Sequence, residues 1–180
     1  MSVFILASCE TEKNNEDQTK KFFDLKGFIE GQITELNLEK PVVSKSMAIG
    51  KERSKLSSKE IDWKKELELF IQADINKPAY KNSYTVNRPD SLTYEYVVKQ
   101  NEKIPVRYLK IKLDRPGGLP VKIEALLQSQ NKLYQSEKKI DLSGIIKNGK
   151  SRTVSYNIDG FQKLITMDKK PFTIQASVML

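Results

Sequence analysis

Residues 107–127, RYLKIKLDRPGGLPVKIEALL, contain the pattern that decides the fold class. Apolar and polar residues alternate on both sides of a central Asp-Arg-Pro-Gly-Gly segment, and a period of two is typical of a strand with one buried face. Pro116 suits the second position of a type II turn, and Gly117 suits the third, which needs a positive φ. So short a turn joins only antiparallel neighbours, because a parallel crossover needs a dozen or more residues. The stretch therefore predicts an antiparallel hairpin.

The same alternation continues on both sides of this hairpin. Before the hairpin, the alternation runs from about Leu92 to Val98. After the hairpin, the alternation returns in segments that begin near Leu133, Val154 and Phe172. Asn148-Gly149, between two of these segments, is a strong signal for a two-residue hairpin turn. We therefore predict an antiparallel β-meander over residues 83–180.

Residues 20–78 have a helical period instead. Apolar residues three or four positions apart predict an amphipathic helix from Lys20 to about Leu38; they are Phe22, Leu25, Ile29, Ile33 and Leu36. Pro41 ends this helix, and residues 42–56 are interpreted as a hairpin with its turn at Gly50-Lys51.

A second helix is predicted to begin at Ser57. Ser57 and Glu60 have the spacing of a capping box, and Leu56 and Ile61 have that of a hydrophobic staple. An apolar stripe follows, made of Trp63, Leu67, Phe70, Ile71 and Ile75. Asn76-Lys77-Pro78 is expected to end the helix.

These segments together predict an α+β fold, in which two N-terminal amphipathic helices pack on a twisted antiparallel β-meander. A chain of 180 residues is the size of one domain. We expect a single domain over residues 20–180, with a helical part at 20–78 and a sheet part at 83–180.

The chain is basic, with 31 Lys and Arg against 23 Asp and Glu and a net charge of +8. The excess lies in residues 101–180, where an anionic partner could bind. The candidate surface comprises Lys110, Lys112, Lys122 and Lys138. The alternative is that these lysines only solvate exposed strands. Nucleic acid is not expected as a partner, because the chain has neither an Arg-rich helix nor an aromatic RNA-binding strand motif.

The N-terminus, MSVFILASC, is an apolar run that ends in Leu6-Ala7-Ser8-Cys9. This run resembles the lipobox of bacterial lipoprotein signal peptides. The resemblance implies cleavage between Ser8 and Cys9 and attachment of a diacylglycerol, with acyl chains such as palmitate, to the Cys9 sulfur. Residues 1–8 are then the remnant of a truncated signal peptide, because no basic segment precedes them. The alternative is a frayed terminus with a buried free cysteine.

Residues 9–19 are polar and acidic and are predicted to form a flexible tether. An acidic stretch directly after the cysteine resembles the surface-export signal of Bacteroidota lipoproteins. The rest of the chain is similar to small uncharacterised lipoproteins of that phylum. These resemblances imply a lipid-anchored protein of the outer membrane, periplasmic or surface-exposed.

Most catalytic and metal-binding constellations are excluded by composition. With no histidine and one cysteine, the chain cannot form a Ser-His-Asp triad, an intrachain disulfide or a thiolate cluster. It has no phosphate-binding loop or dinucleotide fingerprint, and no cofactor or metal is expected. Two Ser-x-x-Lys matches, at Ser129–Lys132 and Ser136–Lys139, fall in turns or strands and are interpreted as chance.

Two weaker hypotheses concern carboxylates and tyrosines. A carboxylate pair of the glycosidase type could come from Glu66 and Asp74, or from Glu95 and Glu124, although charges at polar positions are normally solvated. Four tyrosines on predicted strands could stack on sugar rings, but packing at the core margin is favoured; they are Tyr94, Tyr96, Tyr108 and Tyr156.

The function predicted from the sequence is that of a non-enzymatic binding or structural module of the cell envelope, because the usual catalytic residues are missing. Its expected partners are the membrane, through a lipid at Cys9, and an acidic envelope component or a protein. The alternatives are an envelope glycan hydrolase that uses a carboxylate pair, and a carrier of acyl chains in a concave sheet.

Overall fold

The computed structural model describes residues 20–180, in which nine strands form one antiparallel sheet. The strands are β1 (Val42–Ile49), β2 (Glu52–Ser58), β3 (Tyr84–Asn87), β4 (Thr93–Val98), β5 (Val106–Leu113), β6 (Pro120–Gln130), β7 (Tyr134–Lys147), β8 (Lys150–Leu164) and β9 (Lys170–Met179). The helices are α1 (Leu25–Glu39), α2 (Trp63–Glu66), α3 (Glu68–Gln72) and the 3-10 turn η1 (Pro78–Tyr80).

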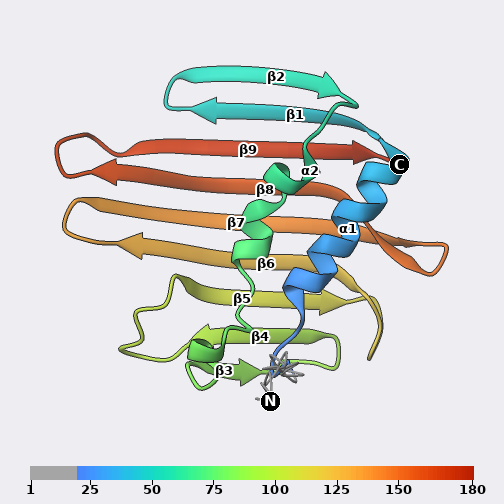
Figure 1. Ribbon diagram of the computed structural model, residues 1–180, viewed down its shortest axis with the longest axis horizontal. Helices are drawn as coiled ribbons and strands as arrows, with labels where there is room; N and C mark the ends of the chain where they lie inside the picture. Colours follow the sequence, from blue (N-terminus) through green and yellow to red (C-terminus); the bar gives the residue numbers. More distant parts are fainter. Residues whose placement is uncertain (1–19) are drawn as a thin grey trace, which may run out of the picture.

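The strand order is β2-β1-β9-β8-β7-β6-β5-β4-β3 (Figure 1). Strands β3 to β9 follow one another as a meander. The last strand then pairs with the first, with Val43 opposite Val178, so that the β1–β2 hairpin extends the sheet beyond β9. The two edges of the sheet are therefore the short strand β3 and the charged strand β2, which is typical of edges that avoid further pairing.

The predicted fold class, with two N-terminal helices on a meander, is wrong. Over residues 20–180 the protein is mainly a nine-stranded sheet, and its α-helices there are one of 15 residues and two of only four and five. The β1–β2 hairpin, which was assigned to the helical part of the chain, belongs to the sheet.

The predicted continuous helix from Ser57 fails for a local reason. Ser57 is the partner of Ser44 in the β1–β2 hairpin, so it cannot cap a helix. Asp62 is the actual cap and accepts a hydrogen bond from the backbone N–H of Lys65. At Leu67 the backbone leaves helical geometry, with φ −99° and ψ 9°, which separates α2 from α3.

The helices lie on one face of the sheet, here called the inner face, and cross its middle strands (Figure 1). Apolar residues of the middle strands point to this face and are buried under the helices; among them are Leu109, Ile111, Ile123, Ile140 and Leu142. Opposite them, the helical segments contribute Leu25, Ile29, Trp63, Leu67 and Phe70, all buried. The core is therefore one layer between helices and sheet.

Two predicted turns are confirmed. The N–H of Gly118 donates to the carbonyl of Arg115, and Gly117 has a φ of 68°, as a type II turn requires. Asn148 and Gly149 both have positive φ values, 52° and 72°, which is the geometry of the two-residue hairpin turn that matches strand twist.

Candidate functional site

The outer face of the sheet, opposite the helices, is polar. Residues that alternate with the buried ones form a row of cross-strand partners from β4 to β2. The row runs through Glu95, Lys110, Glu124, Asp141, Asn157, Gln175, Ser46 and Lys55. Acidic, basic and amide groups are mixed along it, so the outer face does not have a single sign of charge.

The structure brings together three of the four lysines that form the candidate anion-binding surface. Lys110 and Lys112 on β5 lie on the outer face, and Lys112 is the direct partner of Lys122 on β6. Lys138 is two residues from the buried Ile140, so strand alternation places it on the inner face. The four lysines therefore do not form one surface.

Two of these three lysines are already paired with carboxylates. Lys110 Nζ lies 3.2 Å from Glu95 Oε1, and Lys122 Nζ lies 3.3 Å from Glu124 Oε1. The hydrogen bond to Glu95 raises the pKa of Lys110 above its usual value. A lysine beside a carboxylate attracts an external anion less strongly than a free one.

Glu66, a member of one candidate carboxylate pair, is engaged in the core. It forms an ion pair with Lys45 of β1, and the side chains of Lys45 and Glu66 are only 13% and 16% exposed. The hydroxyl of Tyr156 on β8 donates to the same carboxylate. Burial, and next the Glu66 carboxylate, raise the pKa of Tyr156. Glu66 thus joins α2 to the sheet and is not available to a substrate.

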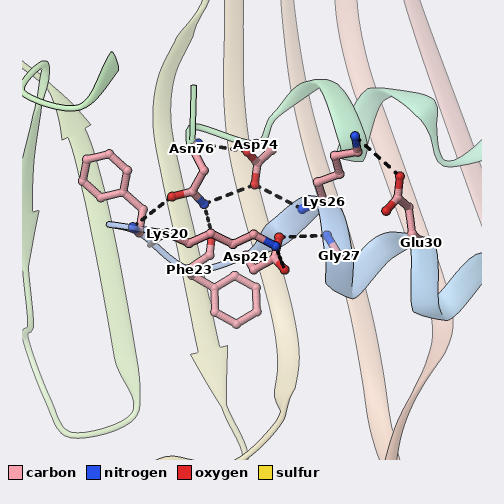
Figure 2. Close-up of polar contacts among 9 residues, drawn as sticks. Lys20, Phe23, Asp24, Lys26, Gly27, Glu30, Asp74 and Asn76 are labelled. Carbon is pink, nitrogen blue, oxygen red and sulfur yellow. Dashed lines mark hydrogen bonds and ion pairs between the residues drawn. The ribbon is translucent and has the colours of Figure 1, made fainter. Parts of the chain in front are cut away.

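Asp74, the other member of that pair, is buried and holds the start of α1 (Figure 2). Its carboxylate accepts hydrogen bonds from the backbone N–H groups of Lys26, at 3.1 Å, and Asn76, at 2.9 Å. Asp24 accepts from the N–H of Gly27 at 3.0 Å in the same cluster. Both carboxylates therefore cap the helix by satisfying N–H groups that have no partner within it.

The second candidate pair, Glu95 and Glu124, is separated by Lys110, which lies between them on β5. Glu124 instead lies directly opposite Asp141 on β7. Burial, and next the charge of Glu124, raise the pKa of Asp141 above its usual value. This pair was not predicted, because its members are 17 positions apart in sequence and meet only through the β6–β7 register.

Three of the four strand tyrosines are core residues, as favoured from the sequence. Tyr96 and Tyr156 are buried, and the Tyr96 hydroxyl accepts a hydrogen bond from the N–H of Phe23. Tyr94 stacks on Tyr96 with ring centroids 6.4 Å apart. Tyr108 differs, because it lies on the outer face and donates to Glu95 at 3.3 Å. The tyrosines therefore do not form a common platform for sugar rings.

A hollow of about 500 Å³, here called the polar cleft, opens where β5, β6 and β7 meet the loop between β4 and β5. Its polar lining contains two acidic residues, two basic residues and three glutamines, namely Glu102, Glu137, Lys103, Arg107, Gln128, Gln130 and Gln135. Ile104 and Pro105 add an apolar part. Its volume is in the range of small-ligand sites, whereas its lining is more polar than is usual for them.

The loop beside the cleft is fixed at several points. Arg107 Nη1 donates to the carbonyls of Glu102, at 2.6 Å, and Ile104, at 3.4 Å. The N–H of Gln128 donates to the carbonyl of Pro105 at 2.8 Å, which ties the loop to β6. A guanidinium carries five N–H donors, so these two carbonyls use only part of the capacity of Arg107.

The strand wall of the cleft consists of cross-strand pairs on β6 and β7. Gln128 lies opposite Glu137 and donates to its Oε2 at 2.8 Å, and Gln130 lies opposite Gln135. The sequence offers one signal for this wall, because apolar alternation stops at Leu127 and polar residues follow. The loop that completes the cleft could not be placed from sequence, since it depends on the tertiary fold.

The serines of the two Ser-x-x-Lys matches, Ser129 and Ser136, are partners on β6 and β7 and line the polar cleft. Neither begins a helix, so the geometry that makes this spacing catalytic is missing at both matches. Within residues 20–180, no group of three or more acidic or cysteine side chains is placed to hold a metal ion.

Cys9 and Ser8, with the predicted signal remnant at 1–8 and the tether at 9–19, lie outside the described residues. None of the helices over 20–180 is both long and apolar enough to cross a bilayer. In comparisons with known proteins, no family model, no curated protein and no solved structure matches this chain.

Proposed function

We infer that the protein is a lipoprotein anchored to the outer membrane through Cys9 and that it acts as a non-enzymatic binding module of the envelope. We infer further that the polar cleft holds a neutral glycan segment. The anchoring rests on the lipobox-like Leu6-Ala7-Ser8-Cys9 sequence. The binding role rests mainly on one observation, the polar cleft with its loop held in place by Arg107.

The chemistry of the cleft favours a ligand without net charge. Two carboxylates and two cationic side chains balance each other, while the glutamine amides both donate and accept hydrogen bonds. Sugar hydroxyl and acetamido groups need this mixture of donors and acceptors. The apolar surface of Ile104 and Pro105 suits a sugar C–H face or an acetyl methyl group.

The contacts of Glu66 and Asp74 within the protein support a role in binding over one in catalysis. Glu66 is held by Lys45 and Tyr156, and Asp74 caps α1. A general acid or a nucleophile has to reach the substrate within hydrogen-bond distance. Both carboxylates are instead occupied by groups of the protein itself.

Glycan hydrolysis is the second candidate, and the pair Glu124–Asp141 favours it. The pKa of the Asp141 carboxyl group is raised by burial and by Glu124, and a raised pKa is what the general acid of a glycosidase requires. Purified protein should release reducing ends from envelope glycans if this pair is catalytic, and Asp141→Asn should abolish the release. Absence of turnover by wild-type protein would remove this candidate.

A role as an acyl-chain carrier in a concave sheet is less well supported. The inner face is covered by the helices, and side chains such as Leu25, Leu67 and Ile123 fill the space without solvent exposure. An acyl chain would need that space.

The test of the binding role is capture of glycans released from the envelope, by immobilised protein at low and at high salt. A neutral ligand in the cleft should be retained equally at both salt concentrations, because uncharged contacts are not screened. An anionic partner on the exposed lysines should be retained at low salt only. Retention of nothing, or only of salt-sensitive anions, would contradict the proposal.

The anchor is tested separately. Protein expressed with a complete signal peptide should partition with membranes into detergent, and Cys9→Ala should leave it in the aqueous phase. A Cys9→Ala protein that still partitions with membranes would contradict lipidation at this residue.

A further inference from the structure

Apolar side chains extend into solvent at one end of the sheet, where the β1–β2, β6–β7 and β8–β9 turns lie. They are between 46% and 69% exposed and form what is here called the apolar tip, which consists of Ile49, Leu133, Leu164, Ile165 and Met167. The turns are neighbours in the fold, because β1 pairs with β9, β9 with β8 and β8 with β7. The N–H of Ile165 donates to the carbonyl of Leu133 at 3.0 Å, which joins two of the turns directly.

The tip is exposed because the helices do not extend this far. Figure 1 shows that α1 and α2 cross the middle of the sheet and leave the turn ends of β1, β8 and β9 uncovered. The inner, apolar face of these strands continues past the helices into a hollow of about 410 Å³. Ile49, Leu164, Met167 and Phe172 are among its lining residues. Neighbouring apolar side chains in solvent on one end of a protein mark an interaction surface.

Lysines surround the tip. Lys132 precedes Leu133, Lys163 precedes Leu164, and Lys169 and Lys170 follow Met167. Asp168 is the acidic residue in the β8–β9 turn, and in the described part of the chain no ion pair involves these four lysines. Lys169 Nζ lies 3.5 Å from the ring centroid of Phe161, so the cation lies against an apolar surface.

We propose that the apolar tip inserts into the headgroup region of an anionic lipid bilayer. Separate Leu, Ile and Met side chains on protruding turns can enter the acyl boundary, while flanking lysines extend their ammonium groups to lipid phosphates. The negative potential of an anionic leaflet attracts such unpaired lysines. The inference goes beyond the proposed glycan binding and does not depend on lipid at Cys9, because the tip supplies its own membrane contact.

The test is flotation of the protein with phosphatidylcholine vesicles that contain or lack phosphatidylglycerol. It uses the full chain with Cys9→Ser, so that no lipid anchor contributes. The protein should float with the anionic vesicles and much less with the neutral ones. Ile165→Ser with Met167→Ser should reduce the bound fraction about tenfold, because two apolar contacts with lipid are lost. Leu38→Ser is the matched control, since Leu38 is 77% exposed on α1, away from the tip, and should float like the parent.

The charge requirement has its own pair of variants. Lys169→Gln with Lys170→Gln should weaken flotation with anionic vesicles and leave the small neutral binding unchanged. Lys64→Gln with Lys65→Gln, on α2, should have no effect. Circular dichroism of each variant confirms that it is folded, as expected for substitutions of exposed side chains.

Two results would overturn the proposal. One is flotation of the Ile165→Ser/Met167→Ser variant equal to that of the parent. The other is that the parent protein does not float and sediments as a dimer, while the Ile165→Ser/Met167→Ser variant sediments as a monomer. That result would mean that the apolar tip binds a second copy of the chain. Glycan capture by the polar cleft needs no vesicles, so failure of that function is measured independently.

Discussion

Gln32 of α1 holds Thr153 of β8 across 121 positions of sequence. The Gln32 Oε1 atom accepts hydrogen bonds from the backbone N–H and the hydroxyl of Thr153, both at 2.9 Å. Gln32 Nε2 donates to the carbonyl of Ser151 at 2.9 Å. Strand β8 pairs with β9 only from Ser155 onward, so at Ser151 and Thr153 a helix side chain supplies the partner that β9 does not provide.

Replacement of Gln32 by leucine should destabilise the protein by about 2–6 kcal/mol. The substitution leaves a buried N–H and a buried carbonyl without partners, at about 1–3 kcal/mol for each such group. Urea unfolding measures the change, with the exposed Gln72→Leu on α3 as the control. A loss below about 0.5 kcal/mol would show that water or a backbone shift replaces the contact.

Glu66→Leu should cost about 3–5 kcal/mol, because it leaves the largely buried Lys45 without its counter-ion. The double variant Lys45→Met/Glu66→Leu should recover most of that loss, since no buried charge then remains unpaired. The free energy of unfolding of both single variants and of the double variant measures the coupling. If the double variant is as unstable as the sum of the single ones, the ion pair is not the reason for the loss.

Trp63→Ala should cost about 3–5 kcal/mol, since the indole is buried at the start of α2. Thermal unfolding gives the comparison with Leu38→Ala, in which an exposed leucine is removed and the effect should be small. A loss of less than about 1 kcal/mol at Trp63 would place its ring on the surface.

Asp141→Asn should stabilise the protein at neutral pH. Burial and Glu124 raise the pKa of Asp141 in the folded state, so its ionisation opposes folding. The protonated Asp141 contributes fully to the stability of the fold when the pH is below the pKa of this residue in the unfolded chain. That contribution is lost as the pH rises through the higher pKa of Asp141 in the folded protein. The melting temperature of the variant should exceed that of wild type at about pH 7 and match it at about pH 3, below the ordinary aspartate pKa.

The control for this prediction is Asp168→Asn, in the exposed β8–β9 turn. It should not reproduce the gain at neutral pH. An Asp141→Asn protein that is less stable than wild type at neutral pH would mean that the ionised carboxylate is required by a neighbour.

The strands could be predicted from sequence because period-two alternation and turn residues act locally. The type II turn at Pro116-Gly117 and the hairpin turn at Asn148-Gly149 are examples. The helix predicted from Ser57 failed because the pairing of β2 with β1 overrode a local capping signal. Tertiary pairing of this kind has no local signature.

The candidate site was harder to predict from the sequence than the strands, because its chemistry depends on which strands pair and in which register. The sequence placed Lys110 and Lys122 in one basic surface, but the register puts Glu95 and Glu124 beside them. The polar cleft depends on the Arg107 contacts with the β4–β5 loop, which no periodicity predicts. Residues that are remote in sequence therefore determine the chemistry of each surface.

The most direct test of the central claim is an NMR titration of the full chain, with Cys9→Ser, with neutral oligosaccharides from the envelope. The account predicts shifts of the amide resonances around Arg107, Gln130 and Gln135, at the polar cleft. Gln130→Ala with Gln135→Ala should weaken binding about tenfold, or 1.4 kcal/mol, while Arg115→Ala, in the turn at the other end of β5, should leave it unchanged. Resonance shifts confined to other surfaces, or equal affinity of the glutamine variant and the parent, would contradict the claim.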